Sequence, residues 1–86
     1  MTNITPRLYV KIGCPWCQQA MGTLQQYQIP YDKIIVSNDA EAMAKMVELS
    51  GQSKAPTMDW DGEILADFGA DELIPFLKAK GIEKPA

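Results

Sequence analysis

The sequence predicts a single α/β domain, residues 1–86, whose elements follow the order β-α-β-α-β-β-α. Apolar residues alternate with more polar ones over residues 7–12 and then recur at helical spacing from residue 17. A second strand-like and helix-like pair repeats this change over residues 31–50, and an Asp-Gly turn then separates two short β-like runs. A βαβ unit makes its strands parallel, and a hairpin adds antiparallel ones. We therefore expect a four-stranded mixed sheet with three flanking helices.

Composition limits the classes of partner. The chain has 8 basic and 11 acidic side chains, a net charge of −3 and no basic run. This pattern argues against binding of nucleic acid or an anionic membrane surface. No apolar run approaches the roughly 18 residues that a membrane-spanning helix needs. The small acidic surface gives no reason to expect more than a monomer.

The N-terminal segment, residues 1–7, lacks the apolar stretch of a signal peptide, so we expect a cytoplasmic protein. A structural disulfide is not expected in that reducing compartment. The chain has no histidine, which excludes Cys–His proteases, histidine general bases and histidine-containing metal sites. A reactive cysteine here must be activated by backbone dipoles and cations alone.

The first strand and helix surround the chain's two cysteines. Alternation predicts a strand over residues 7–12, with Leu8, Val10 and Ile12 on one face. Cys14 is placed to cap the following helix, and Pro15 at its first position loses no hydrogen bond. The helix extends through residues 18–28 and must stop near Ile29-Pro30. Its expected inward face is formed by Cys17, Ala20, Met21 and Leu24.

The second strand and helix occupy residues 31–50. Residues 31–36 have the composition of a strand, and Asn38-Asp39-Ala40-Glu41 resembles a capping box with asparagine as the N-cap. Gly51 is well placed to end this helix. The expected buried stripe consists of Met43, Met46, Val47 and Ser50, with Ala42 and Leu49.

The C-terminal third predicts a hairpin and a third helix. Residues 57–60 and 63–66 flank Asp61-Gly62, a strong signal for a two-residue hairpin turn. The helix begins no earlier than about Ala70, because Pro75 is tolerated only in a first turn. Gly81 is expected to close it. Its inward face is predicted to comprise Leu73, Ile74, Phe76 and Leu77.

The spacing of the two cysteines predicts redox chemistry. Cys14 is the expected nucleophile, since backbone N–H groups and the helix dipole stabilise a thiolate at a helix N-terminus. Cys17, one turn further along and facing inward, is the expected resolving thiol. The alternatives are half of a zinc site, which needs two further ligands from carboxylates, or two inert core thiols.

Three short motifs resemble those of the glutaredoxins, members of the thioredoxin-fold family. Cys14-Pro15-Trp16-Cys17 resembles the Cys-Pro-Tyr-Cys of that family, Ala55-Pro56 resembles the cis-proline of Thr-Val-Pro, and Phe68-Gly69-Ala70-Asp71 resembles Gly-Gly-x-Asp. The resemblance extends from Arg7 to about Lys80 and implies a thioredoxin-like fold. The chain departs from the family in three ways. Threonine and valine are absent before Pro56, and only Gly69 remains of the Gly-Gly pair. The segment between Pro56 and Gly69 is about two residues longer than in short glutaredoxins.

The resemblance implies which residues surround Cys14. Trp16 is expected beside it, covering a bound peptide or disulfide, although it could also serve only in packing. Pro15 removes an N–H near the sulfurs and fixes the start of the helix. The bond between Ala55 and Pro56 is expected to be cis and to present the Ala55 backbone to an extended peptide. The alternative is an ordinary proline that opens an edge strand.

The resemblance also implies contacts to glutathione. Lys11 is expected to stabilise the Cys14 thiolate or to pair with the glycyl carboxylate, unless it is simply a solvated strand lysine. Lys54 and Gln52 are further candidates for that carboxylate. The γ-glutamyl end would be held beside Gly69 by the Ala70 N–H and the Asp71 carboxylate, although Asp71 is equally suited to be a helix N-cap.

The function implied is a glutathione-dependent thiol–disulfide oxidoreductase. It would reduce glutathione mixed disulfides through Cys14 alone and protein disulfides through Cys14 with Cys17. Glutathione would be its reductant, with no metal and no tightly bound cofactor. The alternatives are a glutaredoxin-like redoxin recycled by thioredoxin reductase, an iron–sulfur cluster carrier that uses Cys14 and glutathione as ligands, and a binding module with a vestigial motif.

Overall fold

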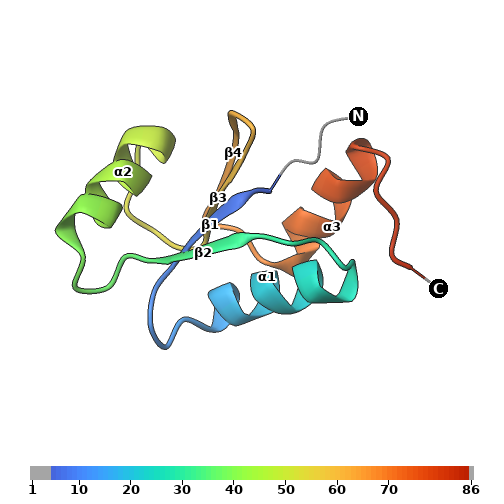
Figure 1. Cartoon of the computed structure of the whole chain (residues 1–86), viewed down its shortest axis with the longest axis horizontal. Helices are drawn as coiled ribbons and strands as arrows, with labels where there is room; N and C mark the ends of the chain where they lie inside the picture. Colours follow the sequence, from blue (N-terminus) through green and yellow to red (C-terminus); the bar gives the residue numbers. More distant parts are fainter. Residues whose placement is uncertain (1–4, 86) are drawn as a thin grey trace.

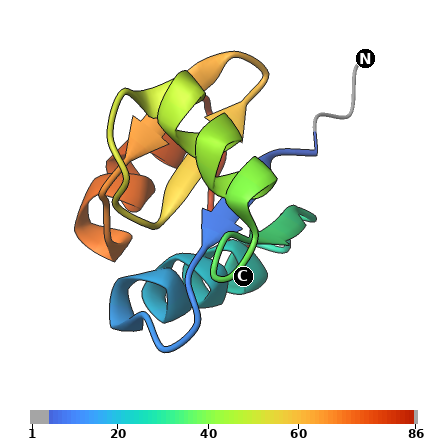
Figure 2. The same ribbon diagram turned by 90° about the vertical axis from the view of Figure 1, so that its left-hand side faces the viewer.

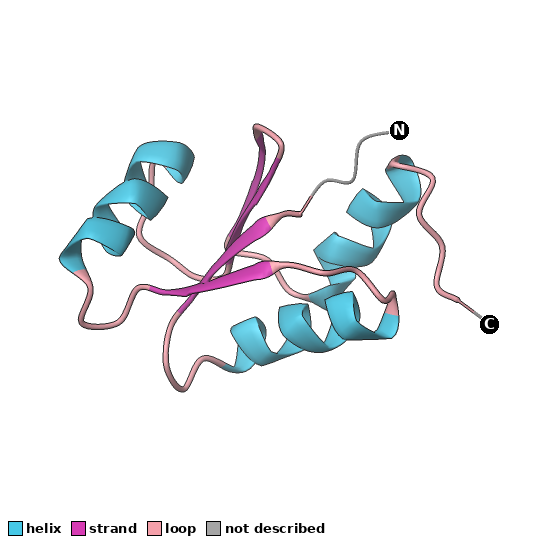
Figure 3. Cartoon of the chain, in the orientation of Figure 1, coloured by secondary structure: helices cyan, strands magenta, loops and turns pink. Residues whose placement is uncertain are grey.

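The computed structural model describes residues 5–85 and has the predicted order of elements (Figures 1 and 3). Most of the N-terminal segment on which the expected cytoplasmic location depends lies outside the described residues. Within residues 5–85, no helix is both long and apolar enough to cross a membrane. The elements are β1 (Arg7–Val10), α1 (Pro15–Gln26), β2 (Asp32–Ile35), α2 (Ala40–Ser50), β3 (Thr57–Trp60), β4 (Glu63–Ala66) and α3 (Ala70–Ala79).

The four strands form one mixed sheet in the order β2-β1-β3-β4. β1 pairs in parallel with β2, so that Leu8 lies beside Lys33 and Val10 beside Ile35. β1 pairs antiparallel with β3, and β3 with β4. The turn between β3 and β4 contains Asp61 and Gly62, both with positive φ (51° and 92°), as a primed hairpin turn requires. The predicted mixed sheet is confirmed.

Helices cover both faces of the sheet. α1 and α3 pack together on one face, and α2 covers the other (Figures 1 and 2). The central strand β1 is therefore enclosed on both sides, and its residues Leu8, Tyr9 and Val10 are all buried. The strand ends at Val10 rather than at Ile12. Ile12 consequently lies in the following loop and is 72% exposed, which corrects its expected place within the strand.

The first helix follows the prediction at its start. Cys14 is its N-cap and Pro15 its first residue. Its buried face consists of Cys17, Ala20, Thr23 and Leu24, whereas Met21 is only partly buried.

The second helix differs from the prediction in its cap and its buried face. Its N-cap is Asp39, whose carboxylate accepts the Ala42 N–H at 3.1 Å, and not Asn38, which adopts a positive φ of 60° one residue earlier. Gly51 ends the helix in the left-handed conformation, as expected. Met46 alone is fully buried, and Val47 is 39% exposed. The reason is that α2 is a single helix on its face of the sheet, with no second helix against its flank.

The third helix begins at Ala70 and buries Leu73 and Leu77. Pro75 is its sixth residue and so lies in the second turn, which corrects its expected place in the first. Pro75 and Asp71 are both exposed, so water can satisfy the Asp71 carbonyl that the proline leaves without a donor. At the other end, the N–H groups of Gly81 and Ile82 donate to helix carbonyls, in the pattern of a Schellman motif.

Candidate active site

Cys14 lies where the loop after β1 becomes helix α1. As the N-cap, its backbone is extended (φ −95°, ψ 111°), which directs the side chain back over the first turn. Its Sγ accepts the N–H of Cys17 at 3.2 Å. A donor aimed at the sulfur and the positive end of the helix dipole both stabilise a thiolate. The Cys14 side chain is partly exposed, so a sulfur that accepts a backbone N–H can also be reached from outside.

Cys17 is the sheltered member of the pair. It is completely buried, and both thiols are reduced. The pKa of the Cys17 thiol is raised from 9.0 to about 11, first by burial and then by the hydrogen bond with Cys14. A backbone N–H of Lys11 partly offsets these effects. Cys17 is therefore a neutral thiol at neutral pH, held within reach of Cys14 but away from solvent.

The loop before β3 supplies the second wall of the site. The Ala55–Pro56 peptide bond is cis, as the resemblance implies, and both residues are buried. The Ala55 carbonyl faces Cys14, whose Sγ lies 3.9 Å away. Gln52 braces this loop, since its Nε2 donates to the carbonyl of Lys54 at 3.1 Å and to Oγ1 of Thr57 at 3.2 Å. The side-chain amide of Gln52 is thus already used in hydrogen bonds within the loop and is not available to a ligand.

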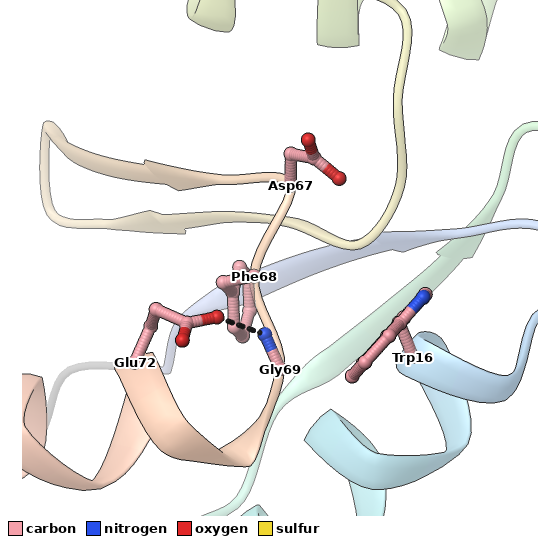
Figure 4. Close-up of a pocket in the computed structure, with 5 residues that line it drawn as sticks. All are labelled: Trp16, Asp67, Phe68, Gly69 and Glu72. Atoms are coloured by element: carbon pink, nitrogen blue, oxygen red, sulfur yellow. Dashed lines mark hydrogen bonds between the residues drawn. The ribbon is translucent and has the colours of Figure 1, made fainter.

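A pocket of about 220 Å³ opens beside Trp16, between the start of α1 and the start of α3 (Figure 4). The indole is 56% exposed and forms one wall, whereas Phe68 is buried and anchors the opposite loop in the core. Gly69 lies directly against the indole, because a Cβ at this position would come within 2.8 Å of Trp16 Cε3. The glycine thus permits the close approach of the two segments. Asp67 and Glu72 complete the lining and make the pocket acidic.

The first backbone donors of α3 are already occupied. The Gly69 N–H donates to Glu72 Oε1 at 2.8 Å, and the Ala70 N–H donates to Oε1 of Gln19 at 3.3 Å. The N-cap of α3 is Gly69, so the reading of Asp71 as the N-cap is wrong; Asp71 is an exposed residue of the first turn. Its carboxylate has no partner among the described residues.

Sequence reasoning missed both Gln19 and Glu72. Glu72 could have been found, because a glutamate three residues after an N-cap position is the spacing of a capping box. Gln19 carries no such local signal, since its partner Ala70 lies 51 residues away in the chain.

The two lysines expected near Cys14 have different surroundings. Lys54 forms an exposed ion pair with Asp67 at 3.8 Å, on the side of the acidic pocket. Lys11 instead lines a different hollow, between the first turns of α1 and strand β2. The structure therefore brings Cys14, Cys17 and the Ala55 backbone together. The Lys11 backbone N–H also contacts Cys17, whereas the Lys11 side chain lines the second hollow. No cluster of three or more potential metal ligands occurs within residues 5–85.

These features define the class of protein. A Cys-x-x-Cys at the N-terminus of the first helix, facing a cis-proline loop, sits on the mixed sheet of a thioredoxin-like fold. A crystal structure of the thioredoxin-like protein BC3987 has the same fold, with a TM-score of 0.76 and 26% sequence identity. The likeness covers 85% of this chain and 100% of that one.

The chain belongs to the glutaredoxin family, whose model matches residues 7–65. A relative in Clostridium pasteurianum, an uncharacterized glutaredoxin-like 8.6 kDa protein in the rubredoxin operon, is 30% identical over 67 residues, which are 78% of this chain and 89% of that protein. A buckwheat glutaredoxin, solved as a complex with glutathione, shares the fold with a TM-score of 0.66 and 19% identity, over 92% of this chain and 81% of that one. Family and fold together support thiol–disulfide oxidoreductase activity.

Proposed function

We propose that the protein reduces disulfides by exchange at Cys14. The observation that carries this proposal is the Cys14 sulfur, which accepts the Cys17 N–H at the start of α1 beside the Ala55 backbone. In the first step the Cys14 thiolate attacks one sulfur of a substrate disulfide. A Cys14–substrate disulfide forms, the substrate S–S bond breaks, and the second substrate sulfur leaves as a thiolate that takes up a proton.

The second step uses Cys17 when the substrate is a protein disulfide. Cys17 loses its proton and attacks the Cys14 sulfur, so that a Cys14–Cys17 disulfide forms and the other substrate thiolate leaves. The substrate gains two electrons and two protons. The protein supplies both electrons and the Cys17 proton, and the other proton comes from solvent. Two of the effects that raise the Cys17 pKa, the hydrogen bond with Cys14 and its charge, come from Cys14 itself. A Cys14 sulfur held in a mixed disulfide has no charge, so Cys17 becomes more acidic at the step that needs its thiolate.

Glutathione is the reductant we propose, on the basis of family membership. Two glutathione molecules convert the Cys14–Cys17 disulfide back to two thiols and become glutathione disulfide. For a glutathione mixed disulfide, Cys14 alone takes the glutathionyl group and a second glutathione removes it. The acidic pocket between Trp16 and Glu72 suits the ammonium end of such a ligand, because Asp67 and Glu72 carry negative charge there.

A second candidate, a redoxin recycled by a thioredoxin-type reductase, is favoured by one observation. Gln19 and Glu72 hold the Ala70 and Gly69 N–H groups that a γ-glutamyl carboxylate would otherwise use. Gln19→Ala frees the Ala70 donor, and Gln25→Ala, an exposed glutamine in the last turn of the same helix, is the matched control. If glutathione is the reductant, Gln19→Ala lowers KM for a glutathione mixed disulfide and Gln25→Ala leaves it unchanged. A wild type that is active only with a reductase, with neither variant gaining glutathione activity, identifies the redoxin.

Trapping of the mixed disulfide tests the exchange chemistry. In Cys17→Ser the second step is blocked, so incubation with a peptide disulfide should leave one peptide half covalently attached to Cys14, seen by mass spectrometry. In Cys14→Ser no adduct is expected, because Cys17 is buried. Adducts on Cys17 in that variant would overturn the assignment of the nucleophile.

The cytoplasmic location and the monomeric state remain proposals. The iron–sulfur alternative predicts visible absorbance after anaerobic purification.

A further inference from the structure

A second hollow lies on the other side of the start of α1 from the acidic pocket. It has a volume of about 210 Å³ and lies between the loop after β1, the inner turns of α1 and the edge strand β2. We call it the cationic groove. Its walls include Lys11, Ile12, Met21, Lys33 and Ile35.

The cationic groove has an apolar floor that solvent reaches. Ile12 is 72% exposed and Ile35 is 42% exposed. Together with Trp16 they are three of the four large apolar side chains that are exposed within residues 5–85. Ile12 is two residues before Cys14 and Trp16 two residues after it, so exposed apolar surface is concentrated around the cysteine loop. Such a concentration on a small chain marks a contact surface.

The charge of the cationic groove is opposite to that of the whole chain. Lys11 and Lys33 both line it, although the chain has a net charge of −3. Within residues 5–85, neither lysine takes part in an ion pair, whereas Lys45, Lys54 and Lys80 each have a carboxylate partner. The two lysines are therefore available to a negatively charged partner.

The groove is within reach of a chain that is bound at Cys14. Ile35 pairs with Val10 across the sheet, and Val10 is four residues before Cys14. Four residues span at most about 14 Å. A substrate segment that begins a few residues from its reacting cysteine can therefore lie along Ile12, Ile35 and Lys33. Lys33 and Ile35 are two apart on β2, so both side chains point to the same face.

We propose that the cationic groove binds an acidic segment with an apolar side chain, located a few residues from the disulfide of a protein substrate. Carboxylates of this segment pair with Lys11 and Lys33, and its apolar side chain covers Ile12 and Ile35. This inference rests on the proposed exchange at Cys14, for which it names a class of substrate. Complementary charge at the rim of such a contact selects partners and speeds their association.

The test uses two peptides of equal length, each with one cysteine in mixed disulfide with thionitrobenzoate, a coloured leaving group. One carries an Asp-Glu-Leu flank and the other a Lys-Lys-Leu flank. At low salt we expect wild type to reduce the acidic peptide with kcat/KM about fivefold higher than the basic one. Lys33→Glu should reverse this preference with kcat unchanged. Lys45→Glu, on the opposite face of the sheet, makes the same change in net charge and should keep it. If wild type showed no preference for the acidic peptide, or if Lys33→Glu kept the wild-type preference, the proposal would be overturned.

Two further measurements separate this inference from the proposed function. Ile35→Thr, which keeps a β-branched side chain on the strand, should lower kcat/KM for the acidic peptide and leave reduction of hydroxyethyl disulfide unchanged. An NMR titration with a cysteine-free acidic peptide needs no thiol chemistry. It should shift the amide signals of Ile12 and Ile35 in wild type and not in Lys33→Glu. Shifts confined to other residues would overturn the proposed binding of the peptide in the cationic groove. This result would hold whether or not Cys14 carries out the exchange.

Discussion

Alkaline pH should destabilise the reduced protein through Cys17. The thiol has a pKa of about 11 in the folded protein and 9.0 in the unfolded chain. Between these values the unfolded chain gives up its proton while the folded protein retains it, so each rise in pH favours unfolding. The contribution of Cys17 to stability is therefore complete below pH 9 and is lost as the pH rises to 11.

The magnitude follows from the difference between the two pKa values. Two pKa units correspond to about 3 kcal/mol of free energy of unfolding. Cys17 is fully buried, so solvent does not weaken this contribution. Small domains are stable by only about 5–15 kcal/mol, so the loss is a large share of the total.

Urea unfolding between pH 8 and pH 11 measures this loss, with a phosphine present to keep both thiols reduced. Fluorescence of Trp60, which is buried, reports unfolding. The control is Cys17→Ala, in which lysines and tyrosines still titrate but this thiol is absent. We expect the wild type to lose about 2–3 kcal/mol more than the control over this range. Parallel loss of stability in the two proteins would refute the reasoning.

Three further substitutions test the packing of the site and the fold. Gly69→Ala places a Cβ against the indole of Trp16, so it should change the Trp16 fluorescence and cost about 1 kcal/mol of stability; an unchanged spectrum would show that the two do not touch. Leu24→Ala in the core should cost about 2–5 kcal/mol in urea unfolding, and a loss below about 1 kcal/mol would contradict its burial. Asp39→Ala removes the α2 cap and should cost about 1 kcal/mol, whereas Asn38→Ala should not lose that hydrogen bond.

The order of the elements was predictable because local patterns decide it. Alternation, helical spacing, Pro15 after Cys14 and the Asp61-Gly62 turn each act within a few residues, and all point to the same fold. The predictions of strand length and side-chain burial failed where these depend on a neighbouring strand or helix. Ile12 continues the alternation of β1 but has no neighbouring strand, and Val47 has helical spacing but no second helix to cover it.

The candidate site likewise has a part that local sequence predicts and a part that depends on contacts between distant segments. The positions of Cys14 at the N-cap and Cys17 in the first turn were predictable because they depend on adjacent residues at the start of one helix. Gln19 was not, because its contact with Ala70 exists only after α1 and α3 pack together. The role of Lys11 toward the Cys14 thiolate or a glutathione carboxylate came from the family resemblance and stays a prediction; in the structure Lys11 lines the cationic groove. Contacts between distant segments were thus the part that sequence reasoning could not supply.

The most direct test of the account is glutathione-dependent reduction of a small glutathione mixed disulfide, coupled to glutathione reductase. Wild type, Cys14→Ser and Cys17→Ser are compared under reducing conditions. We predict activity in wild type and in Cys17→Ser and none in Cys14→Ser, because Cys14 is the partly exposed thiol of the pair and its sulfur accepts the Cys17 N–H. Activity that survives in Cys14→Ser would contradict the assignment of Cys14 as the nucleophile. Activity that disappears in Cys17→Ser, while Cys14 remains reactive, would contradict the prediction that Cys14 reduces this substrate without Cys17.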